Sequence, residues 1–304
     1  MRIRRIGAYG LCHDSAGRVL LARNSELSEF PGRWGLPGGG VQQGEHPDDA
    51  VRREFAEETG LTVRVTGLHS VTADVARLPG SSALEHTDRI IYHVEMVGGG
   101  LRAEVDGTTD TVDWVVPDDR LMMPFTARIL GLPVDRIDAD SRPDRLVVDH
   151  VSGTPRSVQR FGAYALATDP TGRILLTRIA PGYPGAGRWH LPGGGTDHGE
   201  TPEQGLAREL AEETSQQGRI TELIGVSNRH DPAALGPEGI PIDWHVVRVL
   251  FRVSVDAPTE PRVTEEAGGS TEAAGWFGPA QLFDLPLTDV ARLAVEGLAG
   301  EMVS

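Results

Sequence analysis

The sequence predicts an α/β protein in which two tandem domains each place a mixed β-sheet between helices. Three observations support this prediction. The chain has 304 residues, which corresponds to about two domains at roughly 100–200 residues each. Motifs of its first half recur in its second half at a constant offset. Within each copy, short apolar runs typical of strands alternate with helical patterns, which favours layered α/β domains.

The repeat rests on blocks that recur 155 residues later. Gly7-Ala8-Tyr9 recurs as Gly162-Ala163-Tyr164, and Leu36–Gly40 recurs as Leu191–Gly195. The remaining pairs are Asp14 with Asp169, Gly32-Arg33-Trp34 with Gly187-Arg188-Trp189 and, further on, Asp88 with Asp243. An offset of 162 then pairs Trp114 with Trp276, Pro124 with Pro286 and Thr126 with Thr288. A period this long indicates a duplicated domain rather than a solenoid.

The repeat sets the expected domain bounds. We expect a first domain at residues 1–132, a linker rich in Asp, Pro, Ser and Arg at 133–156 with a short strand at 146–148, and a second domain at 157–304. In the first copy, Ile6–Cys12 and Arg18–Arg23 flank a turn and predict a hairpin. The other expected elements are a helix at Pro47–Thr59, strands near Thr62–Val75, Arg89–Met96 and Thr111–Val116, and a short helix from Pro124.

Composition narrows the possible partners. The net charge is −15, which argues against a nucleic-acid-binding surface, because such surfaces are basic. No apolar run approaches the ~20 residues that a membrane helix needs. The single cysteine, Cys12, cannot form an internal disulfide and is expected in a buried strand, which agrees with a cytoplasmic location. Every basic residue is arginine, so a phosphate must be bound by arginine or by a metal.

One segment of the first copy carries a pattern with chemical meaning. Glu54, Glu57 and Glu58 stand at i, i+3 and i+4 and therefore share one helix face, where their charges repel. A hard divalent cation would offset that repulsion, because Mg²⁺ prefers carboxylate and phosphate oxygens. Glu45 and Arg53 are placed to pair and to hold the preceding loop on the helix.

Residues 39–61 resemble the Nudix signature at each of its fixed positions, and the preceding Trp34–Gly38 resembles the lead-in of MutT-type proteins. The matching positions are Gly39, Glu45, Arg53, Glu54, Glu57, Glu58 and Gly60, with apolar Phe55 and Leu61. The second copy matches over 194–216 at Gly194, Glu200, Arg208, Glu209, Glu212 and Glu213. There Ser215 replaces the glycine and Gln216 the apolar residue, so Gly218 is a possible later end for the helix.

The resemblance implies tandem Nudix α/β/α sandwich domains that hydrolyse a diphosphate linked to another group, usually a nucleoside. It implies Mg²⁺, or Mn²⁺, held by Glu57 and Glu58 with Glu54 and the Gly38 carbonyl, which would neutralise the diphosphate and activate a water. In the second copy the corresponding ligands are Gly193, Glu209, Glu212 and Glu213. Either Glu54 or Glu57, with Glu209 or Glu212 in the second copy, is the candidate base.

Other candidates lie outside the signature. Glu85, in a loop just before a strand, and Glu238, in a comparable longer loop, are alternative bases, although a solvated loop charge is the favoured interpretation. Arg23 and Arg178 resemble phosphate-contacting arginines, and Trp34 and Trp189 are candidates to line a nucleobase pocket or to pack beside the glycine turn. His46 and His198 are expected to be solvated.

Three readings of function follow. The first is a metal-dependent hydrolase of nucleoside diphosphate derivatives, with no nucleic-acid or membrane partner. The second is a catalytically reduced sensor that binds a nucleotide, and the third has one active domain beside a binding or dimerisation domain. A prenyl-diphosphate isomerase is disfavoured, since that reading expects an altered signature. Homodimerisation and pairing of the two domains within the chain both remain open.

Overall fold

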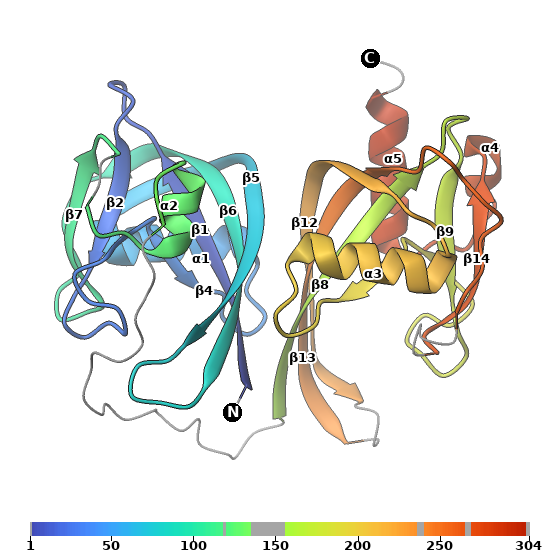
Figure 1. Cartoon of the computed structure of the whole chain (residues 1–304), viewed down its shortest axis with the longest axis horizontal. Helices are drawn as coiled ribbons and strands as arrows, with labels where there is room; N and C mark the ends of the chain where they lie inside the picture. The colour runs from blue at the N-terminus through green and yellow to red at the C-terminus, as the bar shows by residue number, and fades with distance from the viewer. Residues whose placement is uncertain (1, 118–119, 135–155, 236–239, 265–268, 302–304) are drawn as a thin grey trace. The chain divides into compact units, whose positions relative to one another are not determined.

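A computed structural model describes residues 2–117, 120–134, 156–235, 240–264 and 269–301 (Figure 1). Contacts between Cα atoms divide the chain into two compact units, residues 1–159 with 228–245 and residues 160–227 with 246–304. The predicted linker at 133–156, its short strand at 146–148 and Glu238 fall almost wholly outside the described residues. The domain bounds drawn from the sequence therefore stay a prediction.

The first copy contains two sheets. One has the order β4-β1-β6-β5 and the other β3-β2-β7. Their strands are β1 (Arg2–Cys12), β2 (Val19–Asn24), β3 (Trp34–Gly35), β4 (Gly38–Gly40), β5 (Leu61–Arg77), β6 (Leu84–Gly99) and β7 (Thr109–Val115). β1 pairs parallel with β6 and antiparallel with β4, so the sheet is mixed as expected. The predicted hairpin of β1 and β2 is short. The antiparallel bridge between His13 and Val19 and the bond from the Asp14 N–H to the Arg18 carbonyl close its turn, and β2 then joins the other sheet.

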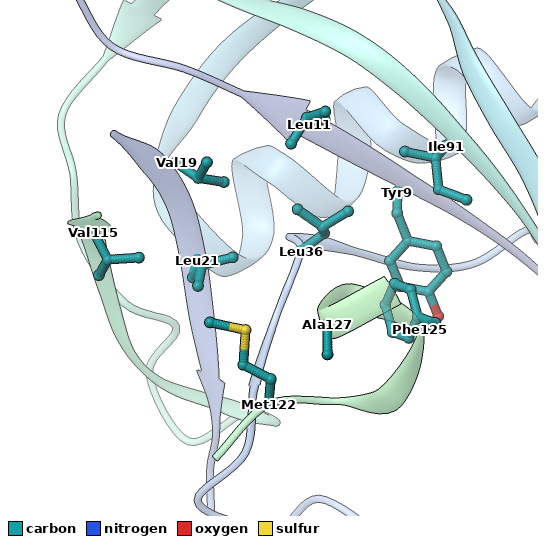
Figure 2. Packing of buried hydrophobic residues seen from close by; sticks show 10 residues of the cluster. All are labelled: Tyr9, Leu11, Val19, Leu21, Leu36, Ile91, Val115, Met122, Phe125 and Ala127. Carbon is teal, nitrogen blue, oxygen red and sulfur yellow. The ribbon is translucent and has the colours of Figure 1, made fainter. Parts of the chain in front are cut away.

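The first core lies between the sheets and α2 (Pro124–Ile129). Tyr9 of β1 lies beside Phe125 of α2, and Leu11 of β1 belongs to the same buried cluster, as Figure 2 shows. Gly10 faces the other way, where an added Cβ would stand 2.4 Å from the ring of Phe55 on α1 (Pro47–Thr59). Alternate residues of β1 are thus buried against different helices, which produces the predicted layering.

The second copy repeats these elements in one seven-stranded sheet, because Thr168 and Ile174 join the strands that correspond to β1 and β2. The strands are β8 (Arg156–Thr168), β9 (Ile174–Ile179), β10 (Trp189–His190), β11 (Gly193–Gly195), β12 (Arg219–Leu235), β13 (Pro241–Ser254) and β14 (Thr271–Phe277). The helices are α3 (Pro202–Thr214), α4 (Pro279–Leu282) and α5 (Asp289–Glu301). No helix within the described ranges is both long and apolar enough to cross a membrane.

The pairing assigned from the repeat is wrong in two places, at Asp88 with Asp243 and at Pro124 with Pro286 and Thr126 with Thr288. Asp88 is fully buried within β6, whereas Asp243 is part-exposed. Packing shows which residues of the two strands are equivalent. Leu166 is the equivalent of Leu11 at the offset of 155. Leu11 shares its core cluster with Ile91, and Leu166 shares its core cluster with Leu250. The offset at this strand is therefore 250 − 91 = 159.

The second error concerns the last helix. The backbone N–H of Met123 donates to the carbonyl of Trp34, and that of Thr288 donates to the carbonyl of Trp189. Met123 and Thr288 also precede the first residues of α2 and α5. Thr288 thus corresponds to Met123 and not to Thr126, which makes the offset here 288 − 123 = 165.

Candidate functional site

The signature helix of the first copy begins and ends where the sequence predicts. The imidazole of His46 accepts a hydrogen bond from the backbone N–H of Asp48 at 3.1 Å, so this residue caps the helix. Gly60 ends the helix with φ 71°, a left-handed conformation that suits glycine. The next residue, Leu61, is buried. These contacts fix where the glutamates of α1 point.

The second signature helix ends at the same point although its glycine is missing. Thr201 and Gln204 form a complete capping box at its start, as expected. Ser215 takes the left-handed conformation, φ 55°, so α3 ends at Thr214 and Gly218 has no part in ending it. Gln216 is buried, and its side-chain amide donates to Thr259 Oγ1 at 2.8 Å. Hydrogen bonds thus replace the apolar contact of Leu61.

Arg53 gathers the acidic residues of the first copy. Its Nε and Nη2 donate to the two oxygens of Glu45, each at 2.9 Å, and Nη2 also donates to the Gly40 carbonyl at 2.9 Å. Its Nη1 donates to Glu54 at 2.7 Å and to Glu57 at 3.2 Å. One guanidinium therefore ties the loop to the helix and lies between two of the candidate metal ligands.

Glu54 and Glu58 lie against the glycine turn. A Cβ on Gly39 would stand 2.6 Å from the carboxylate carbon of Glu54, so only glycine leaves room for that carboxylate. Glu58 accepts from the backbone N–H of Gly38 at 2.9 Å and from the hydroxyl of Thr109 at 3.1 Å. Burial raises the pKa of Glu58 to about 8, with the charge of Glu54 adding to the shift. Burial also raises the pKa of Glu54.

The second copy reproduces this arrangement. Arg208 donates to Glu200, Glu209 and Glu212 at 2.9–3.2 Å and to the Gly195 carbonyl at 3.0 Å. Glu213 accepts from the backbone N–H of Gly193 at 2.8 Å and from the hydroxyl of Thr271 at 2.5 Å. Burial raises the pKa of Glu213 to about 7.

The two copies differ in how open the middle carboxylate is. The Glu57 side chain is 51% exposed, whereas the Glu212 side chain is 24% exposed. In the second site, the segment that contains Thr264 is bonded to the signature helix, because Thr264 donates both its backbone N–H and its hydroxyl to the Glu212 carbonyl. The first site thus offers its central carboxylate more freely to a ligand from solution.

The candidate phosphate-binding arginines are part of ion pairs. Arg23 donates to Asp110 at 2.8 Å, and Arg178 pairs with Glu272 at 2.8 Å. Asp110 follows Thr109, the residue that bonds Glu58, so Arg23 lies at the edge of the carboxylate cluster. Arg178 stands in the same relation to Thr271 and Glu213.

The two tryptophans flank these arginines. Trp34 pairs with Arg23 between β3 and β2, and Trp189 pairs with Arg178 between β10 and β9. Trp34 packs partly buried against the core, with the Arg120 guanidinium 5.0 Å from its ring centroid. Trp189 packs edge-on against Phe277 at 4.6 Å. Both indoles therefore have packing roles beside the glycine turn.

Glu85 lies in strand β6 and not in a loop, so the sequence misplaced it. It pairs with Ile3 of β1, and its carboxylate accepts from the hydroxyl of Thr87 at 3.2 Å. It does influence the site electrostatically, because Glu85, Glu29 and Glu54 all raise the pKa of Arg5, after the larger effect of Tyr9.

Two duplicated pairs of residues were missed by the sequence reasoning. Thr109 and Thr271 bond Glu58 and Glu213, and each precedes an acidic residue at the offset of 162, which is a signal that could have found them. Arg5 and Arg160 are 155 apart. A Cβ on Gly40 would lie 3.5 Å from Arg5 Nε, and one on Gly195 would lie 3.1 Å from Arg160 Nη2.

The donors suit a hard cation by type. They are carboxylate oxygens beside a glycine turn that leaves no space for a Cβ, which is the chemistry that Mg²⁺ and Mn²⁺ select. Among the described residues, no three His, Cys, Asp or Glu side chains are yet grouped as metal ligands. Arg53 donates from one nitrogen to both Glu54 and Glu57, and Arg208 does the same to Glu209 and Glu212.

Comparison with known proteins places the chain in a family. The model of the NUDIX domain matches residues 2–130 and again residues 158–296. A Mycobacterium tuberculosis protein named "Putative 8-oxo-dGTP diphosphatase 2" is 36% identical over 121 residues, 37% of this chain and 82% of that protein. "Nucleoside triphosphatase NudI" of Escherichia coli is 29% identical over 120 residues, 38% of this chain and 79% of that protein.

Solved structures include similar chains. A MutT NUDIX hydrolase from Burkholderia pseudomallei is 35% identical, with a TM-score of 0.37, and the match covers 46% of this chain and 98% of that one. Proteins of the family are hydrolases of phosphoric anhydride bonds and generally need divalent metal ions. Because the family model matches twice and the two matches together cover most of this chain, the chain belongs to the NUDIX family as a tandem member.

Proposed function

We propose that the chain is a divalent-metal-dependent hydrolase that cleaves the diphosphate bond of a nucleoside diphosphate derivative, with one active site in each copy. The observation that carries this proposal is the duplicated cluster in which two helix glutamates lie against a glycine turn and an arginine joins the third to them. Mg²⁺ is the proposed cofactor, and Mn²⁺ could serve in its place.

The proposed metal ligands of the first site are Glu54, Glu57, Glu58 and the Gly38 carbonyl. Those of the second site are Gly193, Glu209, Glu212 and Glu213. Bound metal would neutralise the diphosphate and make a water nucleophilic near neutral pH. This also accounts for how a chain of net charge −15 takes an anionic substrate.

Protein side chains supply orientation and proton transfer in this proposal. Gly38 N–H and Thr109 fix the orientation of Glu58, and Arg53 fixes Glu45 and the helix. Glu54 or Glu57 takes the proton of the attacking water, and Arg53 holds both carboxylates in place by donating to each. Glu209 or Glu212 acts likewise in the second site.

The substrate is proposed to lie along the strands beside the cluster. Arg23 and Arg178 would contact its phosphates after exchanging their acidic partners, and Trp34 and Trp189 would border the group attached to the diphosphate. The relatives named as acting on 8-oxo-dGTP and on nucleoside triphosphates favour a nucleotide. A cytoplasmic location, the absence of a nucleic-acid partner and the oligomeric state stay predictions.

The test is loss of Mg²⁺-dependent phosphate release in the double variant E57Q/E212Q, assayed with nucleoside triphosphates and nucleoside diphosphate derivatives. We expect at least about a 100-fold decrease in kcat, because each glutamine removes a charged donor needed in the transition state. The matched control is D49N/E203Q, which makes the same chemical change in the first turns of the two helices. Undiminished turnover in E57Q/E212Q would refute the proposal.

The single variants decide between two active sites and one. If both sites act, E57Q and E212Q each retain part of the activity. If the second copy only binds a ligand, E57Q alone abolishes turnover. Tight nucleotide binding without any turnover in the wild-type chain would favour the sensor reading instead.

A further inference from the structure

The nine-residue blocks that lead into the two signatures are identical except at one position. Gly32–Gly40 and Gly187–Gly195 share every residue but the fourth, which is Gly35 in the first copy and His190 in the second. Both residues lie in short strands that pair with equivalent residues, Ala22 and Thr177. A residue without a side chain in one copy is thus replaced by an imidazole in the other, within an otherwise unchanged segment.

This change is matched by a second change in a residue distant in sequence. Met123 and Thr288 occupy equivalent places before the last helix. A Cβ on Gly35 would point at Met123 Cγ, 3.6 Å away. In the second copy, His190 Nδ1 instead forms a 2.6 Å hydrogen bond with Thr288 Oγ1. The small glycine faces a long apolar side chain, and the large imidazole faces a short polar one.

Tyr164 connects His190 with the carboxylates of the second site. Its ring meets that of Tyr164 edge-on, with centroids 5.1 Å apart. Tyr164 pairs with Gly193, one of the proposed metal ligands, and the charges of Glu213 and Glu209 both act on its phenol. A substrate held by those carboxylates would therefore bring its attached group close to His190.

The chemistry of this imidazole indicates what it could recognise. Burial, helped by the nearby Arg248 and Arg188, lowers the pKa of His190 to about 3, so the ring is neutral at physiological pH. A neutral ring is a poor partner for a phosphate and a good one for an uncharged polar group. Nδ1 is bonded to Thr288, while Nε2 makes no hydrogen bond within the described part of the chain.

We propose that His190 is a specificity-determining residue of the second site, which uses Nε2 to hydrogen-bond the polar edge of the base attached to the diphosphate. The first site, with Gly35 and Met123 in these places, meets the same part of its substrate with apolar surface. The two sites therefore prefer different bases. This inference rests on the proposed function for the position of the substrate.

The test measures binding, so that it does not depend on turnover. Calorimetric titrations with Mg²⁺ would compare AMP, GMP, CMP, UMP and ribose 5-phosphate on the full wild-type chain, H190G and H190N. H190G should weaken binding of at least one base by about fivefold or more, the equivalent of one net hydrogen bond. Binding of ribose 5-phosphate, which has no base, should change less than twofold, and H190N should restore part of the loss.

The first copy provides the reciprocal variant. G35H/M123T installs the pair of the second copy, and we expect it to shift the order of base preference at the first site toward that of the second. Equal weakening of ribose 5-phosphate and the nucleotides in H190G, no change in any ligand, or no binding of any of them to the wild-type chain would each overturn the inference. Base-dependent binding together with undiminished turnover in E57Q/E212Q would sustain it while refuting the proposed function.

Discussion

Ser215 ends α3 in the same left-handed conformation that Gly60 adopts at the end of α1, with φ 55° and 71° respectively. A residue with a Cβ is strained there by about 1–2 kcal/mol. The Ser215 hydroxyl offsets part of this strain, because it donates to the Arg262 carbonyl at 2.9 Å. A side chain cannot be accommodated at Gly60 in the same way, since an added Cβ would stand 2.6 Å from the Gly100 carbonyl oxygen.

These two helix ends predict opposite effects of exchange. S215G should change the free energy of unfolding by less than about 1 kcal/mol, because relieved strain and the lost hydrogen bond nearly cancel. G60S should destabilise the first copy by about 2 kcal/mol or more, through strain and the contact with Gly100 together. Urea unfolding followed by circular dichroism measures both. A larger loss in S215G than in G60S would contradict the prediction.

The buried carboxyl of Glu213 predicts how stability depends on pH without metal. Its pKa is about 7 in the fold and near 4.5 when unfolded, so the folded state holds the extra proton between these values. Stability contributed by this group is therefore lost as pH rises from about 4.5 through 7. E213Q, which stays neutral, should be more stable than the wild-type chain at pH 8 by about 1–3 kcal/mol and should show a flatter pH profile.

Thermal unfolding in EDTA between pH 5 and 9 measures this effect, with E203Q, at a part-exposed carboxylate of the same helix, as the control. Mg²⁺ should raise the melting temperature of the wild-type chain at pH 8 more than that of E213Q, because bound ligand stabilises only the folded state. An unchanged pH profile in E213Q would show that another group dominates.

The closeness of Gly39 to Glu54 predicts a sharp difference between neighbouring glycines. These variants are made in the E212Q chain, so that the first site alone is measured. There G39A places a Cβ 2.6 Å from the Glu54 carboxylate carbon and must displace it, so we expect at least about a tenfold decrease in kcat. G40A is the matched control, since its Cβ would have an ordinary contact of 3.5 Å with Arg5. Steady-state kinetics with saturating Mg²⁺ decides, and equal effects of the two alanines would contradict the prediction.

The geometry of Arg53 predicts that lysine cannot replace it. Arg53 bonds both oxygens of Glu45 and also reaches Glu54 and the Gly40 carbonyl, which a single ammonium cannot match. In the E212Q chain, where only the first site is measured, R53K should reduce kcat by about tenfold or more and weaken the apparent affinity for Mg²⁺. R52K, at an exposed arginine of the same helix, is the control and should change neither. Full activity of R53K would show that its charge alone suffices.

The sequence by itself determined the family, the duplication and the two signature helices. Periodicity and capping are local, so Pro47–Thr59 begins and ends as the residues indicate, Pro202–Thr214 begins as they indicate, and each helix places its three glutamates on one face. The end of the second helix at Thr214 was left open by the sequence, because Ser215 replaces the glycine there. The pairing of Arg53 with Glu45 spans only eight residues and could be expected from spacing.

Only the tertiary structure decided which distant residues meet at the site. Thr109 reaches Glu58 and Arg5 lies over Gly40 through strand pairing, which a linear pattern does not encode. The correct offsets between the two copies were also decided by the structure. The offset is 159 instead of 155 at the strand of Asp88, and 165 instead of 162 at the helix of Thr126. Insertions before a strand shift its register without altering its apolar pattern, so the sequence does not reveal them. The hydrogen bond between His190 and Thr288 could not be expected from the pairing of Thr288 with Thr126. The two residues come together because the segment before the last helix lies beside β10.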